Sequence, residues 1–183
     1  MLAANLGTVP AAAHTIALTV SSFTFSAAVG VGAATAVRVG HAIGAGDVAL
    51  ARRRGVIGLG LGLGMMASFA AVFVALPSQI VQVFSADPGV LAVAVPLFLV
   101  AALFQLSDGA QAIAAGALRG LGDTRATLIG NLIGHYAIGL GISLVCAYGF
   151  GLGVVGLWIG LSVGLTVTAL YLMARFLAGT RAR

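Results

Sequence analysis

The sequence predicts an all-α, polytopic membrane protein with five transmembrane helices, and three observations predict this fold class. Hydrophobic residues make up 61% of the 183 residues and charged residues only 7%, whereas soluble domains carry about 25% charged residues. The apolar residues form long runs, and a helix of about 20 such residues crosses a bilayer. All nine basic residues are arginines, and they lie at the ends of these runs. We therefore expect lipid to surround most of the chain.

The positions of the charges define the five spans. The first two are charge-free stretches, and the third contains a single acid, Asp108. Arg125 and Arg175 then enclose 49 residues without a formal charge, which is too long for one crossing and long enough for two, with a glycine-rich turn at 149–153 between them. The predicted spans cover residues of about 11–36, 55–77, 90–117, 126–148 and 152–175.

The distribution of arginine predicts the orientation of the chain. If the first span is entered from outside, the cytoplasmic segments are 37–54, 118–125 and the tail from Arg175, and together they hold every arginine. The outer loops hold only one charged residue, Asp87. Membrane insertion favours this asymmetry. We expect a single lobe over residues 10–176, with 177–183 as a cytoplasmic tail.

Composition also indicates a source and excludes several functions. The use of Arg and Asp without any Lys or Glu, together with much Ala and Gly, is typical of a GC-rich bacterial genome, so we expect a bacterial inner membrane. The net charge of +5 does not indicate nucleic-acid binding, because the arginines flank apolar spans. Cys146 is the only cysteine, so no disulfide framework or metal-binding cysteine pair is expected. Gly151-Leu-Gly153-Val-Val-Gly156 matches a dinucleotide motif by letters alone, since no acid follows Asp123. We expect a transporter without an organic cofactor, and not an enzyme.

Asp108 is the most informative residue of the sequence. It lies 11 residues before Arg119, which is about 16 Å along a helix and therefore near the middle of a hydrocarbon core about 30 Å thick. A carboxylate at this depth is costly unless it is protonated, paired or bound to a cation. Gln105 and Gln111 lie three residues to either side, on the same helical face. We expect a site at Asp108 for a proton or a cation, and Na⁺ is the only metal ion expected there. The alternative is a structural hydrogen-bond cluster between helices.

Two histidines, His135 and His14, lie within predicted apolar spans. His135 and Tyr136 lie about 15 Å from Arg125 by the same helical rise, so they also approach the middle of the membrane. They are candidates for a proton relay or for the wall of a substrate cavity; a neutral, hydrogen-bonded interior histidine is the alternative. We expect His14, near the outer end of its span, to be interfacial.

Glycines are spaced for helix packing in the second span. Two G-x-x-x-G pairs overlap there, formed by Gly58, Gly60, Gly62 and Gly64. Such pairs allow helix backbones to approach closely in lipid. We interpret them as packing positions and not as a binding motif.

Five strings, taken in order and with their spacing, resemble one known family. They are Ala12-Ala13-His14, Arg38-Val-Gly-His-Ala-Ile-Gly-Ala-Gly-Asp47, Leu103-Phe-Gln-Leu-Ser-Asp108-Gly-Ala-Gln111, Gly116-Ala-Leu-Arg-Gly-Leu-Gly-Asp-Thr-Arg125 and Gly156-Leu-Trp158-Ile-Gly160. Nearly the whole chain takes part in the match. It resembles the C-terminal half of the multidrug and toxic compound extrusion (MATE) transporters.

The resemblance implies the back lobe of a twelve-helix transporter, with residues 1–9 as the stub of the seventh helix. It implies a secondary active antiporter that exports cationic drugs or toxic organic compounds in exchange for Na⁺ or H⁺. Asp108 matches the acidic position of the tenth helix, so the coupling role is implied for Asp108, and Gln105 and Gln111 match the flanking positions. Gly141 stands where a proline often kinks the eleventh helix of the family.

Several alternatives stay open at this stage. The expected partners are small cationic or amphipathic drugs, the lipid bilayer and an N-terminal lobe that this chain does not contain. Because one lobe cannot form a cavity between two lobes, a non-transporting fragment or a structural membrane subunit is the main alternative. A related lipid-linked oligosaccharide flippase would carry more basic residues in its cavity, and no arginine lies inside a predicted span.

Overall fold

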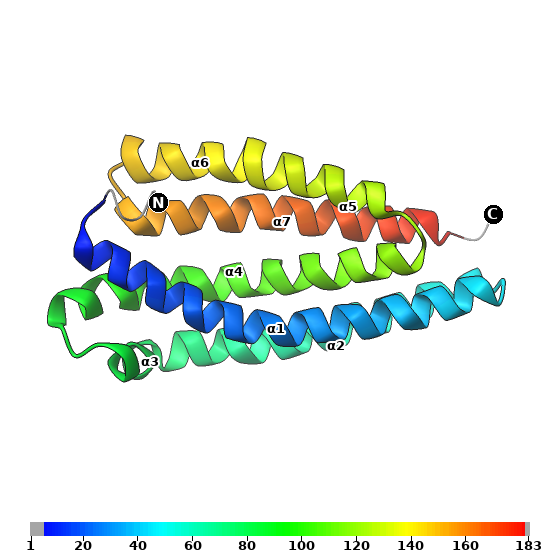
Figure 1. Cartoon of the computed structure of the whole chain (residues 1–183), viewed down its shortest axis with the longest axis horizontal. Coiled ribbons are helices and arrows are strands. Elements are labelled where there is room, and N and C mark those ends of the chain that lie inside the picture. Colours follow the sequence, from blue (N-terminus) through cyan, green and yellow to red (C-terminus); the bar gives the residue numbers. More distant parts are fainter. Residues whose placement is uncertain (1–5, 182–183) are drawn as a thin grey trace.

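The computed structural model describes residues 6–181, and this part of the chain is helical without a strand. Five of its helices are long and apolar enough to cross a membrane, and they run along one common axis (Figure 1). They are α1 (Thr8–Gly44), α2 (Val48–Ala75), α4 (Pro88–Gly120), the composite helix Thr124–Gly149 and α7 (Gly153–Gly179). The predicted all-α fold class with five transmembrane helices is confirmed. Residues 1–5 of the expected stub, and Arg183 with its neighbour at 182, lie outside the described residues.

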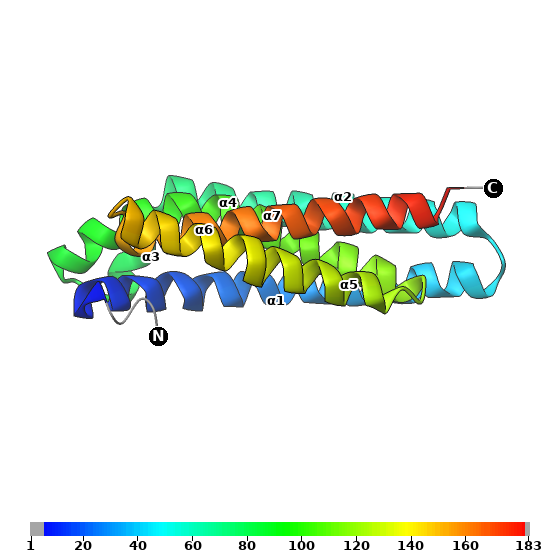
Figure 2. The same cartoon turned by 90° about the horizontal axis from the view of Figure 1, so that it is seen from above.

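Helices α1 and α2 extend well past their predicted spans. The 37 residues of α1 correspond to about 55 Å of helix, whereas the hydrocarbon core is about 30 Å thick. Both helices therefore project together beyond the rest of the bundle, towards the turn at 45–47 (Figures 1 and 2). Within this projection Arg54 Nη1 donates to the carbonyl oxygen of Arg38 at 2.9 Å. The segment 37–54, which was predicted to be cytoplasmic, is thus mostly helix.

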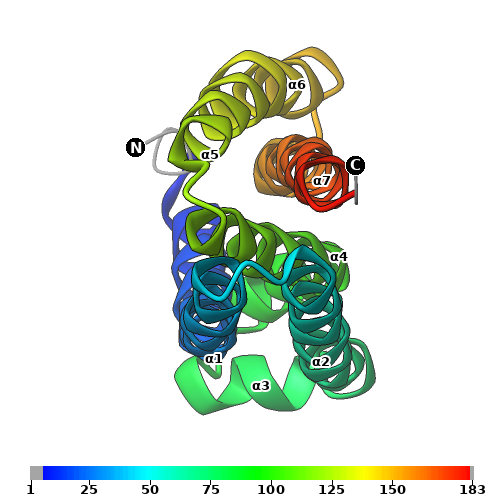
Figure 3. The same ribbon diagram turned by 90° about the vertical axis from the view of Figure 1, so that its right-hand side faces the viewer.

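A short helix, α3 (Pro77–Phe84), was not predicted. The second span was expected to end at about Pro77, but α2 ends at Ala75 and Pro77 begins the new helix. Proline fits the first turn of a helix because its missing N–H has no partner there. Helix α3 runs across the long axis of the bundle, below α1 and α2 (Figure 3), and it contacts α2 and α4.

Helix α4 lies at the centre and packs against α1, α2 and α7. A Cβ added at Gly116 would lie 2.2 Å from the carbonyl oxygen of Gly32 in α1, so the two backbones touch. On α2, a Cβ at Gly62 would collide with Ile113 of α4, while Gly60 has nothing within 4 Å. Of the two predicted G-x-x-x-G pairs, therefore, only the one that contains Gly62 packs against other helices.

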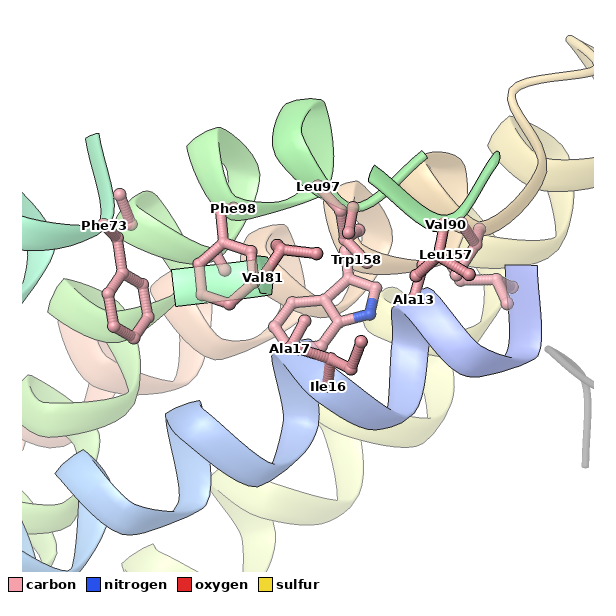
Figure 4. Packing of buried hydrophobic residues seen from close by; sticks show 14 of the residues in the cluster. Ala13, Ile16, Ala17, Phe73, Val81, Val90, Leu97, Phe98, Leu157 and Trp158 are labelled. Atoms are coloured by element: carbon pink, nitrogen blue, oxygen red, sulfur yellow. The ribbon is translucent and has the colours of Figure 1, made fainter. Parts of the chain in front are cut away.

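One buried apolar cluster between these helices contains Trp158 of α7 (Figure 4). Its indole is 1% exposed, and its Nε1 donates to His14 Nδ1 at 3.0 Å. The imidazole therefore joins α1 to α7, and His14 is half-buried near the first turns of α1; its expected position at the membrane interface stays a prediction. Ala13, Ala17 and Phe98 belong to the same buried cluster.

Helix α7 packs against the composite helix through glycine. Gly156, Gly160 and Gly164 lie four residues apart, and a Cβ at Gly160 would lie 2.2 Å from the backbone nitrogen of Ser143. The composite helix consists of α5 (Thr124–Asn131), η2 (Leu132–Gly139), α6 (Leu140–Leu144) and η3 (Val145–Gly149). The η segments are π-helical, a widened form that often occurs at functional sites. Where the family often has a proline kink, this chain has Gly141 in a short α-helical piece between two π-helical segments.

Candidate functional site

One face of α4 carries the polar residues of interest. Asp108, Gln111, Ala112, Ala115 and Arg119 are spaced by three, four, seven and eleven residues from Asp108, so they form one stripe along the helix. From Gln111 to Arg119, four members of this stripe line a groove between α1, α4 and α5. Asp108 lies one turn beyond, on the side towards the middle of the helix.

Asp108 is half-buried within a long apolar helix. It lies 20 residues after Pro88 and 11 residues before Arg119, well inside α4. No hydrogen bond or ion pair of its carboxyl group is found within residues 6–181. An ionisable group at such a depth without a partner is a candidate for ion or substrate binding.

The groove beside this stripe, which we call the inner groove, has a volume of about 190 Å³. It is lined by Phe25, Val29, Gln111, Ala112, Ala115, Arg119, Thr127 and Asn131. Gln111 Nε2 donates to Asn131 Oδ1 at 2.8 Å, which joins α4 to α5 at the end of the groove nearest Asp108. Thr127 Oγ1 is buried and has no hydrogen-bond partner in the described part of the chain.

A second groove continues from the first along the composite helix. It has a volume of about 490 Å³ and is lined by Gln111, Leu128, Asn131, Leu132, His135, Tyr136, Leu140 and Leu161; we call it the hairpin groove. Gln111 and Asn131 belong to both grooves. His135 Nδ1 is buried without a partner among the described residues, and Tyr136 is 70% exposed at the rim. The structure therefore brings Gln111, His135 and Tyr136 to one groove; their role in a substrate cavity stays a prediction.

Gln105 lies apart from these three residues. Its side chain is fully buried, and its amide donates to Thr24 Oγ1 of α1. The expected stripe from Gln105 to Gln111 breaks here because each three-residue step falls short of a full turn, so the two glutamines lie about 120° apart around α4. Gln105 joins two helices and lines neither groove.

Charge is distributed unevenly along the bundle. Each arginine of residues 6–181 lies at the end where α1, α4 and α7 finish and α2 and α5 begin, and the opposite end carries Asp87. At the arginine-rich end Arg175 Nε donates to Asp123 Oδ2 at 2.8 Å. The hydrogen bond from Arg175 holds the pKa of the Asp123 carboxyl group below its usual value. Arg119 has no such acidic partner in the described structure.

Three residues of the grooves were missed by the sequence analysis. Asn131 is an amide within an apolar span, and the reasoning applied to Gln105 and Gln111 applies to it equally. Arg119 was interpreted only as a helix-end arginine, and Thr127 was not singled out. Their place in the groove depends on how α5 packs beside α4, for which the sequence offers no local signal.

Oxygen atoms dominate the chemistry near Asp108. Its carboxylate and the free Oε1 of Gln111 are ligands suited to a hard cation or to an amine. No group of three or more His, Cys, Asp or Glu side chains that could hold a metal ion occurs among residues 6–181.

Comparisons with known proteins agree on one family. The model of the MatE family matches residues 1–145. The chain is 43% identical over 187 residues to the probable multidrug resistance protein NorM of Deinococcus radiodurans, covering 100% of this chain and 42% of that protein. It is 40% identical over 176 residues to the multidrug resistance protein NorM of Burkholderia vietnamiensis, with 93% of this chain and 38% of that protein covered.

Solved structures agree on the fold. The eukaryotic MATE transporter AtDTX14 superposes with a TM-score of 0.87 at 24% identity, over 92% of this chain and 38% of that chain. The Vibrio cholerae MATE transporter VcmN in the bent form gives a TM-score of 0.85 at 19% identity, over 98% of this chain and 41% of that chain. These likenesses concern the arrangement of the helices.

These matches cover nearly all of this chain but only part of each relative. The chain spans about two fifths of the length of the curated relatives it matches. Bacterial relatives and five helices that could cross a membrane identify a multi-pass membrane protein. Since the family model covers most of the chain and the relatives cover nearly all of it, the chain belongs to the MatE family, whose motifs its sequence carries.

Proposed function

We propose that this chain is the C-terminal lobe of a secondary active antiporter that exports cationic drugs or toxic organic compounds in exchange for Na⁺ or H⁺. Asp108 is the residue at which the coupling ion and the drug compete. The observation that supports this role is a half-buried carboxyl group, deep in α4, without a partner in residues 6–181. The chain's membership in a family with multidrug resistance relatives supports a drug-like substrate.

Competition for one carboxylate is sufficient for antiport. A carboxylate in a region of low dielectric gains most from a cation that replaces lost water. If the outward-facing state favours Na⁺ or H⁺ and the inward-facing state favours the drug, the difference in affinity couples the two fluxes. Gln111 Oε1, one turn from Asp108, adds an acceptor for an ammonium group or a hydrated ion.

The grooves supply one wall of the proposed cavity. The hairpin groove offers leucine side chains for the apolar part of a drug, with His135 and Tyr136 as the polar and aromatic groups. A binding site for a small molecule normally encloses most of its ligand, and these grooves are open on one side. We infer that a second lobe of the transporter covers them, with the arginine-rich end and the C-terminus in the cytoplasm, as the positive-inside rule favours.

The test is Asp108→Asn in the complete reading frame that encodes this chain, expressed in bacteria that lack their major efflux pumps. Asparagine keeps the size of the side chain and removes its charge. We expect efflux of tetraphenylphosphonium to be lost, because the competition has no charged site, while the amount of protein in the membrane stays unchanged. Ser107→Ala is the matched control: Ser107 is adjacent in α4, and its hydroxyl lies 2.7 Å from that of Thr166 in α7.

The outcomes separate the proposal from its alternatives. Efflux at the normal rate in Asp108→Asn would contradict the coupling role. If the unaltered protein exports no organic cation under either ion gradient, the chain is a structural subunit or a non-transporting fragment. Export of a lipid-linked oligosaccharide that does not depend on Asp108 would indicate the flippase instead.

A further inference from the structure

His14 and Trp158 form a polar contact at the end of the bundle opposite the arginines. Trp158 Nε1 donates to His14 Nδ1 at 3.0 Å, and the two rings meet edge to face with their centroids 6.0 Å apart. An indole N–H can only donate, so the imidazole presents a lone pair at Nδ1 and carries its hydrogen on Nε2. Within residues 6–181 no other side-chain hydrogen bond joins α1 to α7. We call this pair the outer contact.

The outer contact lies at the edge of a buried apolar cluster. Trp158 is 1% exposed and shares this cluster with Ala13 and Ala17 of α1, beside which its indole lies (Figure 4). The ring of Phe104 in α4 packs on the indole at a centroid distance of 4.9 Å. A buried donor that loses its acceptor is costly. The state of the His14 imidazole therefore affects whether α1 stays against α7.

The acceptor in this contact is a group that can take up a proton. Histidine ordinarily changes its charge between about pH 5 and 8, and the second proton binds the nitrogen that holds the lone pair, which here is Nδ1. A proton on Nδ1 turns the acceptor into a donor that faces the donor of Trp158. Proton binding and the hydrogen bond therefore exclude each other.

His14 is within reach of protons from that end of the bundle. It is half-buried and lies six residues after Thr8, where α1 begins, which is about 9 Å of helical rise. Among residues 6–181 no ion pair includes His14. The other ionisable side chains at this end are Asp87, which precedes α4, and Cys146 and Tyr148 of η3. No fixed ionic partner in the described structure therefore sets the charge of His14.

His14 and Asp108 are separate sites. Helices α1 and α4 run in the same direction, and Gln105 of α4 donates to Thr24 of α1. His14 lies ten residues before Thr24, and Asp108 lies three residues after Gln105. The two titratable groups are therefore about 20 Å apart along the bundle. Charges at this distance interact weakly, so each group can bind a proton independently of the other.

We propose that His14 is a second proton-binding site of the transporter, at its outer end, and that a proton bound there breaks the outer contact and releases α1 from α7. The inference rests on the proposed function for its orientation, which places the end opposite the arginines outside the cell. External acid then loosens the end of the lobe from which Na⁺ or H⁺ is to reach Asp108. The competition at Asp108 itself is unaffected, because the movement is confined to the outer end.

Two substitutions separate the acceptor from its ability to bind a proton. His14→Asn places an amide oxygen where Nδ1 lies, so the indole keeps an acceptor that does not titrate. His14→Phe keeps a flat ring and removes the acceptor, so the outer contact is broken at every pH. His41→Asn is the matched control, because His41 is exposed at the opposite end of α1.

The indole N–H of Trp158 reports the outer contact directly. The complete transporter is labelled with ¹⁵N-tryptophan in lipid nanodiscs, and the resonance is assigned by its absence from Trp158→Phe. We expect it to move in one titration step between about pH 8 and 5 in the unaltered protein and in His41→Asn. It should stay fixed in His14→Asn. A resonance that does not move in the unaltered protein, or that moves equally in His14→Asn, would overturn the proton site.

Spin labels measure whether α1 is released. They are attached through Leu18→Cys in α1 and Val163→Cys in α7, both exposed positions, in the complete transporter with its other cysteines replaced by serine. We expect the ratio of long to short distances to rise about fivefold between about pH 8 and 5, the shift expected from the loss of one hydrogen bond. His14→Asn should stay short and His14→Phe long at every pH. A titrating indole with an unchanged distance would overturn the release of α1.

Failure of this proposal and failure of the proposed function give different results. If Asp108→Asn abolishes efflux of tetraphenylphosphonium but the indole resonance of the unaltered protein does not titrate, only the proton site at His14 fails. If the resonance and the distance change with pH but Asp108→Asn exports normally, the proposed function fails and His14 remains a proton site. The apparent Kd for tetraphenylphosphonium should be the same in His14→Asn as in the unaltered protein, and a loss of affinity there would contradict the separation of the two sites.

Discussion

The face of α4 towards α1 and the face towards α5 carry different kinds of residue. Towards α1, Gly116 lets two backbones meet, and no side chain larger than hydrogen fits there. On the side of α4 that faces α5 lie Ala115 and, one turn later, Arg119. There α4 and α5 leave a groove between them. In lipid, close packing drives helix association where polar groups are absent. The comparison shows that a glycine marks the closest backbone contact of α4, whereas Ala115 and Arg119 lie where α5 leaves a groove beside it.

Polar residues follow the same division. Gln105 is fully buried on the packed face and donates to Thr24, whereas Asp108, three residues later, has no partner within residues 6–181. A polar group that joins two helices contributes to stability, and one without a partner is available to a ligand. Spacing of three residues was therefore enough to place the two side chains in different environments.

The largest effect on stability is expected where α4 and α1 meet. Gly116→Ala would place a methyl group against the Gly32 carbonyl, so the helices must separate, and we expect a loss of about 1–3 kcal/mol. Gly60→Ala is the matched control, because Gly60 has open space around it and alanine favours a helix by about 0.5–1 kcal/mol. Equilibrium unfolding of the complete protein in detergent measures both. Equal effects in the two variants would show that α1 and α4 do not meet at Gly116.

A smaller loss is expected from the buried polar contact. Thr24→Val removes the acceptor of the Gln105 amide and leaves that amide unpaired, at a cost of about 1 kcal/mol. Thr15→Val is the control, since Thr15 is exposed and its hydroxyl bonds only to the Ala11 carbonyl of its own helix. The same unfolding measurement applies, with no change expected in drug efflux. A strong loss of efflux in Thr24→Val at unchanged stability would place Gln105 in the transport mechanism after all.

The smallest effect is expected at the surface. Asp123 accepts from Arg175 and also caps α5 through the Ala126 backbone N–H at 3.2 Å. Asp123→Asn keeps the cap and removes the charge, so its effect should be slight, as for most exposed ion pairs, while Asp123→Ala also loses the cap at about 1 kcal/mol. Because the pKa of Asp123 is lowered in the folded state, the pair stabilises the fold above the unfolded pKa of about 3.9 and this contribution disappears as the pH falls through the folded value. Identical melting curves for the two variants would contradict the capping role.

Much of the fold was predictable because the membrane restricts it. Charge-free runs and the positions of the arginines indicated five spans, since a lipid-exposed chain must satisfy its backbone hydrogen bonds within helices. Helix α3 was not predictable in this way, because its eight residues are too few to register as a span and its apolar positions merge with the end of α2. The π-helical segments around His135 were also not predicted, since nothing in the residue types there distinguishes them from α-helix.

The site was predictable only in part. Asp108 stands out in any apolar run, and the predicted third span placed it inside a helix, where the structure has it in α4; its coupling role stays a prediction. The groove beside it depends on the angle at which α5 lies beside α4 and on the link between Gln111 and Asn131, both of which are long-range. Arg119 illustrates the limit: the sequence identifies it as a helix-end arginine, and its position in the groove follows from tertiary packing alone.

The central claim is that one carboxylate is shared in turn by the drug and the coupling ion. Binding of tetraphenylphosphonium to the purified complete transporter, measured at a series of Na⁺ concentrations and pH values, tests it most directly. The account predicts that the apparent Kd rises with Na⁺ or with H⁺ in the unaltered protein and is independent of both in Asp108→Asn. A dependence of equal strength in the two proteins would contradict it, because the competing site would then lie elsewhere.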